Sequence, residues 1–138
     1  MATSYFIVNR ELSADGQRLT VQFDGLGVNL TMVPLDTNNT RQHWSISPDG
    51  PSTIVLRDSP DVQALPSQGF VIGGKQESSH LWTFNTNPPG PGGLAIEDSG
   101  EAIWGVETAG IQQVILGEDT GHFTQRWILQ PVVEPLPK

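Results

Sequence analysis

The sequence alternates between apolar and polar positions far more often than it repeats apolar residues every three or four positions. Residues 19–23 and 28–32 both alternate in this way, as half-buried strands do. Clusters of Gly, Pro, Asp and Asn, such as 48–51 and 87–93, interrupt these runs roughly every 8–12 residues. The pattern predicts an all-β protein of many short strands, without long helices.

A tryptophan motif occurs three times along the chain. Each copy has a polar residue two positions before the tryptophan and an apolar residue two positions after it. The copies lie at 42–46, 80–84 and 125–129 and contain Trp44, Trp82 and Trp127. A large aromatic side chain buries about 150–250 Å², so one indole per copy predicts much of a shared core. We interpret the three tryptophans as structural.

An apolar residue also stands eleven positions before each tryptophan: Val33, Val71 and Leu116. The repeated offset indicates three copies of one unit of four strands. The expected strands are 4–9, 18–23, 28–34 and 43–47, then 53–57, 62–65, 69–73 and 81–85, then 93–97, 102–106, 112–117 and 126–130. We expect a single domain over 1–138, with repeats at about 4–47, 53–85 and 93–130.

Twelve strands in three equal sets predict a barrel of six strands capped by three hairpins, an arrangement that leaves few exposed strand edges. The inward-facing side chains are then Trp44 with Ile46, Trp82 with Phe84, Trp127 with Leu129, and the apolar residues on the third strand of each repeat. Gln42, His80 and Gln125 are expected to hydrogen-bond backbone groups beside the tryptophans.

Charge and cysteine content exclude several function classes. The 138 residues include seven Lys and Arg, fifteen Asp and Glu and no Cys, for a formal net charge of −8. A polyanion repels nucleic acid and anionic membranes. Without cysteine the chain forms no disulfide and no thiolate metal site. The N-terminus lacks the basic and apolar regions of a secretory signal, so we expect a cytoplasmic protein.

Candidate catalytic groups are few, and we predict no enzyme, no cofactor and no metal site. His43, His80 and His122 lack a metal-ligand spacing, and the chain has no glycine-rich phosphate loop. The acidic pairs Asp98 with Glu101 and Glu118 with Asp119 fall in predicted loops. We interpret them as solvated turn residues rather than as a catalytic pair.

The three tryptophan motifs, together with residues 5–19 and 33–36, resemble the ricin-B-type β-trefoils of mushrooms. Within that group the small, acidic, cysteine-free chain is most similar to the cocaprins. The resemblance implies a β-trefoil that inhibits papain-like cysteine proteases and pepsin-like aspartic proteases, and it implies a homodimer. One fold hosts many activities, so the loops decide the function.

The resemblance places cysteine-protease inhibition in the segment Asp24, Gly25, Leu26 and Gly27, between the second and third strands. Glycine permits the close backbone approach that a protease cleft requires, and Leu26 would fill a hydrophobic specificity pocket. The alternative is a plain hairpin turn, since Asp-Gly is common in such turns.

An aspartic protease would need a second surface, and two loops are candidates for it. The first, 85–93, contains Pro88 and Pro89, whose rigidity lowers the ordering cost of binding. The second, 117–123, contains Glu118, Asp119 and the apolar Phe123. The alternative for the first loop is a crossover between repeats.

A second hypothesis is a cytosolic lectin that binds glycans in defence. Its candidate contacts are Trp104 and Asp98, because Trp104 matches a tryptophan of the sugar site in related lectins. Leu94 stands where those lectins carry a second aromatic residue. Trp104 would otherwise fill the barrel.

Overall fold

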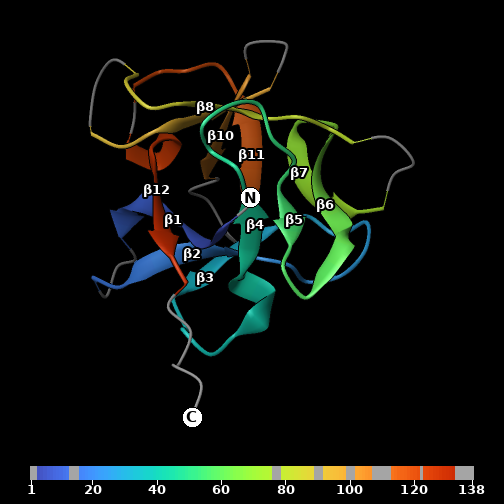
Figure 1. Ribbon diagram of the computed structural model, residues 1–138. Helices are drawn as coiled ribbons and strands as arrows, with labels where there is room; N and C mark the ends of the chain where they lie inside the picture. The colour runs from blue at the N-terminus through green and yellow to red at the C-terminus, as the bar shows by residue number, and fades with distance from the viewer. Residues whose placement is uncertain are drawn as a thin grey trace.

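The computed structural model describes residues 3–12, 16–75, 79–88, 92–98, 102–106, 113–121 and 123–132. Twelve strands run through these residues, four in each predicted repeat (Figure 1). The first repeat holds β1 (Thr3–Leu12), β2 (Arg18–Gln22), β3 (Thr31–Pro34) and β4 (Trp44–Ile46). The second holds β5 (Val55–Leu56), β6 (Ser59–Ser67), β7 (Phe70–Gly74) and β8 (Thr83–Asn85). The third holds β9 (Ala95–Glu97), β10 (Ile103–Val106), β11 (Val114–Gly117) and β12 (Trp127–Pro131).

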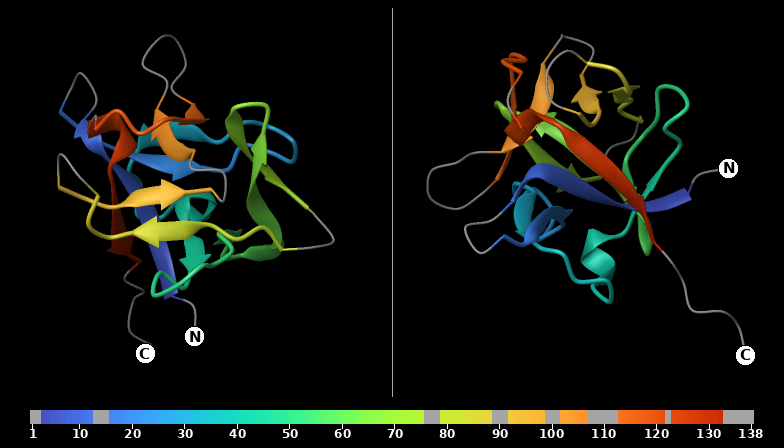
Figure 2. Two further views of the ribbon diagram at one scale, coloured as in Figure 1. Left: turned by 90° about the horizontal axis from the view of Figure 1, so that it is seen from above. Right: turned by 90° about the vertical axis from the view of Figure 1, so that its left-hand side faces the viewer.

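Six of the strands close into a barrel. Strand β1 pairs with β12 on one side and with β4 on the other, β4 pairs with β5, and β8 pairs with β9. Two isolated bridges, Ser52 to Trp82 and Leu94 to Trp127, complete the ring. Figure 2 shows the long antiparallel ribbon of β1 and β12, the blue and red strands. Closure satisfies the strand edges that an open sheet would expose.

The other six strands form three hairpins, β2–β3, β6–β7 and β10–β11, which meet one another at one end of the barrel. The Leu30 amide donates to the Val71 carbonyl at 2.8 Å, and the Val114 amide donates to the Leu30 carbonyl at 2.9 Å. The Leu116 amide donates to the Gly69 carbonyl at 2.9 Å, which joins the second and third hairpins. A six-stranded barrel with three interlocked hairpins is the β-trefoil that the repeats predicted.

The three repeat tryptophans lie at the centre of the core and are fully buried. Each indole N–H donates to the carbonyl of a residue on the second strand of its own repeat. The bonds run from Trp44 to Val21, from Trp82 to Ala64 and from Trp127 to Trp104, at 3.1, 3.0 and 3.1 Å. The repeated motif therefore marks one structural role, a core indole that also bonds the hairpin backbone.

The eleven-residue offset selects a fully buried residue in the second repeat alone. Val71 is fully buried, whereas Val33 and Leu116 are half-buried. In β3, Met32 pairs with Val21 and shares its inward face, so the neighbouring Val33 points the other way. Leu116 pairs with the buried Trp104 and packs against the core, so the prediction of an inward-facing residue is confirmed for Val71 and Leu116 and is wrong for Val33.

Gln42 and Gln125 hydrogen-bond backbone groups beside the tryptophans, as predicted. Gln42 donates through Nε2 to the Pro34 carbonyl at 3.2 Å and accepts through Oε1 from the Asp36 amide at 2.9 Å. Gln125 repeats this arrangement with a carbonyl and an amide two residues apart, those of Glu118 and Thr120. Both glutamines end short 3₁₀ turns, η1 (Thr40–Gln42) and η2 (Phe123–Gln125).

His80 does not play the same part as the glutamines. Its Nε2 lies 2.9 Å from the Asp98 Oδ1, so the imidazole bonds a side chain of the third repeat. The backbone amide of His80 instead donates to the Gln63 Oε1 at 3.0 Å. The prediction that His80 bonds a backbone group is wrong, because a carboxylate lies within its reach.

Candidate functional site

The segment Asp24–Gly27 lies at the surface, between β2 and β3. The Val28 amide donates to the Gly25 carbonyl at 3.2 Å, which closes a four-residue turn with Gly27 at φ 76°. A positive φ at the third position of a turn favours glycine. The turn leaves the Leu26 side chain 55% exposed, so the segment presents an apolar side chain to solvent.

The backbone of this loop is fixed to the second repeat. The Gly27 amide donates to the Gly73 carbonyl of β7 at 2.8 Å, and Leu26 bridges Gly73. At the other end, the Asp24 carboxylate accepts from the Gln22 Nε2 at 2.8 Å. The loop is therefore an anchored turn with two exposed apolar side chains, Leu26 and the 46% exposed Val28. The hairpin turn that the sequence offered as an alternative is confirmed, and protease binding by this segment stays a prediction.

Of the two candidate prolines in the loop at 85–93, the structure describes one. Pro88 is buried, so its ring is not available to a protease, and that prediction is wrong. Pro89 lies outside the described residues.

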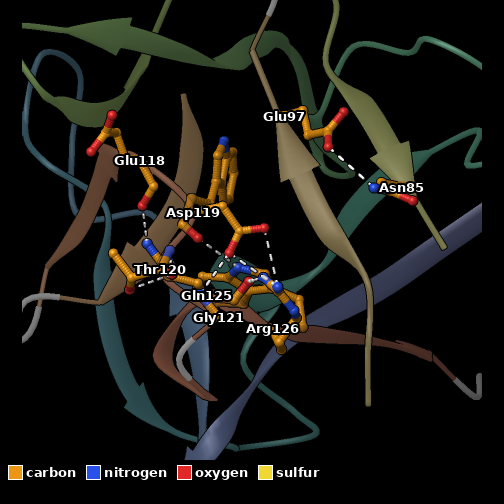
Figure 3. Close-up of polar contacts among 10 residues, drawn as sticks. Asn85, Glu97, Glu118, Asp119, Thr120, Gly121, Gln125 and Arg126 are labelled. Atoms are coloured by element: carbon orange, nitrogen blue, oxygen red, sulfur yellow. Dashed lines mark hydrogen bonds and ion pairs between the residues drawn. The ribbon is translucent and has the colours of Figure 1, made fainter. Parts of the chain in front are cut away.

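The loop after β11 uses its acidic residues in different ways (Figure 3). Asp119 accepts from the Arg126 Nη2 through both carboxylate oxygens, at 3.0 and 3.1 Å, and from the Gly121 amide at 2.9 Å. Because the Arg126 side chain is fully buried, Asp119 is needed to compensate its charge. The Glu118 carboxylate points away from this cluster. The side chain of Phe123 lies outside the described part of the protein.

The predicted glycan contacts, Trp104 and Asp98, do not form an exposed pair. Trp104 is 0% exposed and packs edge-on against Trp82 and Trp127, with ring centroids 5.3 and 6.0 Å apart. Asp98 is held by His80. A side chain without exposed surface cannot stack on a sugar, so the prediction of Trp104 as a glycan contact is wrong and its alternative, barrel filling, is correct.

A hollow of about 660 Å³ opens on the second repeat, where β5 and β6 face the segments that follow β7 and precede β8. The residues that line it combine an ion pair, neutral polar groups and two apolar side chains. They are Thr53, Val55, Pro60, Asp61, Gln63, Lys75 and Ser79. In small-ligand sites, polar groups of this kind fix the orientation of the ligand beside apolar side chains. We name this cavity the repeat-2 hollow.

Its polar groups are positioned by the strands around it. The Lys75 Nζ lies 3.0 Å from the Asp61 Oδ2, across the open end of the β6–β7 hairpin. Gln63 pairs with Gly74 in the same hairpin and accepts from the His80 amide. This hydrogen bond fixes the backbone at His80 and therefore the neighbouring Ser79. Three separate stretches of chain are thus held around one cavity.

A smaller hollow, of about 250 Å³, opens at the corresponding place in the third repeat. Ser79 and Thr124 each stand three residues before a repeat tryptophan, and each lines its own hollow. Gln63 and Ile103 correspond too, because each precedes the residue whose carbonyl accepts the indole bond. Around the smaller hollow, Gln125 is committed to Thr120 and to the Glu118 carbonyl (Figure 3). The described lining of the repeat-2 hollow includes an ion pair, whereas the described lining of the smaller hollow includes no charged side chain.

The sequence analysis did not find the hollow, and Asp61 was not among its candidate glycan contacts. Lys75, Gln63, Ser79 and Thr53 were missed. One signal was available: the position three residues before the tryptophan is a hydroxyl residue, Ser79 or Thr124, in both repeats that carry a hollow.

Two further classes of site are not seen in the parts that the structure describes. Across those ranges, no three His, Asp or Glu side chains are gathered closely enough to hold a metal ion. Within the same ranges, no helix has the length and apolar character required to cross a bilayer.

A protein-family model described as CCL2 lectin-like matches residues 3–127. The chain belongs to the CCL2 lectin-like family. This membership places it among the lectin-like β-trefoils that the tryptophan motifs resemble. A sequence search among curated proteins returns no match.

Solved structures with the same fold include lectins and toxins. The Rhizoctonia solani agglutinin is 16% identical, with a TM-score of 0.69, and the match covers 95% of this chain and 96% of that one. A non-toxic homologue of type II RIPs from Momordica charantia, solved in complex with α-methyl-D-galactoside, is 17% identical with a TM-score of 0.69. That match covers 94% of this chain and 48% of the bitter gourd protein.

A mosquitocidal holotoxin is also similar, at 17% identity and a TM-score of 0.76. The match covers 95% of this chain, yet this chain spans 17% of the length of the holotoxin. At these identities the likeness shows the β-trefoil fold.

Proposed function

We propose that the protein binds glycans and that the repeat-2 hollow is the binding site. The observation that carries the proposal is the lining of the hollow, which combines two apolar residues, Val55 and Pro60, with five polar ones: Asp61, Lys75, Gln63, Ser79 and Thr53. Membership of a lectin-like family supports the same class of function.

The chemistry of the hollow suits a saccharide. Carboxylate and amide oxygens accept hydrogen bonds from sugar hydroxyls, while an ammonium group and side-chain hydroxyls donate to sugar oxygens. Val55 and Pro60 offer an apolar surface for the C–H face of the ring. No aromatic side chain is found in the described lining. We therefore expect weak binding of single sugars and tighter binding of oligosaccharides that fill the cavity.

A bulky side chain in the hollow tests the proposal. We expect Ser79→Trp to reduce glycan binding at least tenfold, because the indole would occupy the space of the sugar. The measurement is binding to a glycan array, followed by calorimetric titration with the best glycan. Ser47→Trp is the matched control, since Ser47 is exposed and lies outside the described lining. Equal binding by both variants would contradict the placement of the site.

A second proposed function is inhibition of papain-like cysteine proteases through the β2–β3 loop. It is favoured by the outward Leu26 between Gly25 and Gly27, on a backbone fixed to β7. An anchored loop loses little conformational entropy when it enters a cleft.

Titration of papain with the protein tests this second function. We expect reversible inhibition that Leu26→Glu weakens at least tenfold, because a carboxylate would be desolvated in an apolar specificity pocket. Leu81→Glu is the matched control, since Leu81 is also a leucine and is 53% exposed. Undiminished papain activity at tens of micromolar protein would refute the inhibitor proposal. Pepsin is titrated in the same series to test the Glu118–Asp119 loop.

A further inference from the structure

The repeat-2 hollow carries one ion pair at its rim. The Lys75 Nζ and the Asp61 Oδ2 lie 3.0 Å apart, and the two side chains are 57% and 62% exposed. Among the described lining residues, Lys75 is the one cation and Asp61 is the one anion. The formal charge of these described lining residues is therefore zero.

The pair is ionised over the whole neutral range. The hydrogen bond from Lys75 lowers the pKa of Asp61 below its ordinary value of 3.8, while desolvation acts in the opposite direction. Lysine is protonated at neutral pH. A carboxylate of the protein itself therefore stands 3.0 Å from the Lys75 ammonium group at neutral pH.

On the basis of the proposed glycan-binding function, we infer that Asp61 restricts the repeat-2 hollow to uncharged saccharides by occupying Lys75. An acidic sugar would have to displace the Asp61 carboxylate from Lys75 or approach beside it. Displacement replaces one exposed ion pair with another and gives no net gain, while approach brings two negative charges together.

The charge of the whole protein acts in the same direction. A formal net charge of −8 repels an anionic ligand at long range. The field exerts no net force on a neutral saccharide. The sugar can still accept a hydrogen bond from Lys75 and donate one to Asp61. The ion pair therefore selects by charge and keeps both partners available for hydrogen bonds with hydroxyl groups.

Asp61→Asn tests this inference, because it removes the carboxylate charge at nearly constant shape. The probes are matched pairs of glycans, in which each neutral glycan is presented beside the same glycan carrying a sialic or uronic acid. The readout is the ratio of acidic to neutral binding within each pair. We expect wild type to favour neutral members, and we expect Asp61→Asn to raise the ratio about 2- to 5-fold at low salt. High salt should reduce that gain.

Asp58→Asn is the matched control. Asp58 forms an ion pair of similar length, 3.1 Å from the Nε of the half-buried Arg57, and it lies outside the described lining of the hollow. The substitution changes the net charge by the same amount as Asp61→Asn. We expect it to leave the acidic-to-neutral ratio within experimental error of wild type.

The outcomes separate the inference from the function on which it rests. If wild type binds neutral glycans but Asp61→Asn leaves the ratio unchanged, or Asp58→Asn raises it equally, selection by Asp61 is refuted and glycan binding stands. Equal wild-type binding of acidic and neutral members also refutes the selection. If wild type binds no glycan of the panel, both proposals fall.

Discussion

At the scale of single residues, the fold depends on three indole N–H groups that work both as core packing and as hydrogen-bond donors. Each joins a repeat tryptophan to the second strand of its repeat across distances of 3.0–3.1 Å. In a dry core, a carbonyl that loses its donor retains the full cost of desolvation. These tryptophans are therefore less replaceable than other buried aromatic residues.

Trp127→Phe should show this difference. The substitution removes the donor to the Trp104 carbonyl, and we expect an unsatisfied buried carbonyl to cost about 1–3 kcal/mol of unfolding free energy. The loss of ring volume adds to the cost. The measurement is urea unfolding followed by circular dichroism.

Trp104→Phe is the control for ring volume. Trp104 is equally buried, but its indole N–H has no hydrogen-bond partner among the described residues. We expect it to destabilise less than Trp127→Phe, by about 1 kcal/mol or more. Equal destabilisation would mean that packing alone explains why a tryptophan recurs at this position in each of the three repeats.

The same residues show what the sequence could and could not predict. The motif identified Trp44, Trp82 and Trp127 because the repeat itself distinguishes core positions from others. Trp104 stands outside the motif, in a strand whose four residues, Ile103–Val106, are all buried. Without alternation, the strand gives no indication of which side chains face solvent.

At the scale of elements, the β2–β3 loop and β7 form one unit. Gly73 accepts the amide of Gly27, and the Phe23 ring covers the place where a Cβ on Gly73 would stand. A Cβ there would lie 2.4 Å from the Phe23 Cδ1. The absence of a side chain at Gly73 is thus a condition for docking the loop.

Gly73→Ala should therefore destabilise the protein by about 1–3 kcal/mol, because a half-buried aromatic ring must move. We expect the loop at 24–28 to become more susceptible to limited proteolysis. Gly117→Ala is the control, since a Cβ at Gly117 would have no atom within 4 Å. A thermal melt of both variants checks the prediction, which fails if Gly73→Ala melts with wild type.

Turn clusters predicted the number and order of the twelve strands, whereas their ends depended on pairing. The expected strand 28–34 begins three residues late, as β3 at Thr31, because its first part makes only isolated bridges to the neighbouring hairpin. The expected strand 62–65 is longer, as β6 from Ser59 to Ser67, because β7 pairs along its second half. Pairing with residues distant in sequence therefore determines where these strands begin and end.

At the scale of the whole molecule, pseudosymmetry places two hollows at corresponding positions with different chemistry. In the second repeat the lining includes Asp61, Gln63 and Lys75, whereas in the third it includes Ile103 and Gly117. The sequence did not predict either hollow, because each lining combines residues from several strands whose relative placement requires the closed barrel. The backbone arrangement is therefore the same in the two repeats, whereas the side chains that line the two hollows differ.

Closure of the barrel also has a consequence for biosynthesis. Tyr5 is paired with Pro131, so one edge of the first strand gains its neighbour only when the last strand has left the ribosome. A chain with many such distant partners has a high contact order, and folding is then slow, on the order of milliseconds to seconds. Until that moment the nascent polypeptide exposes a pairing edge, which is the kind of surface through which incomplete β-sheets aggregate.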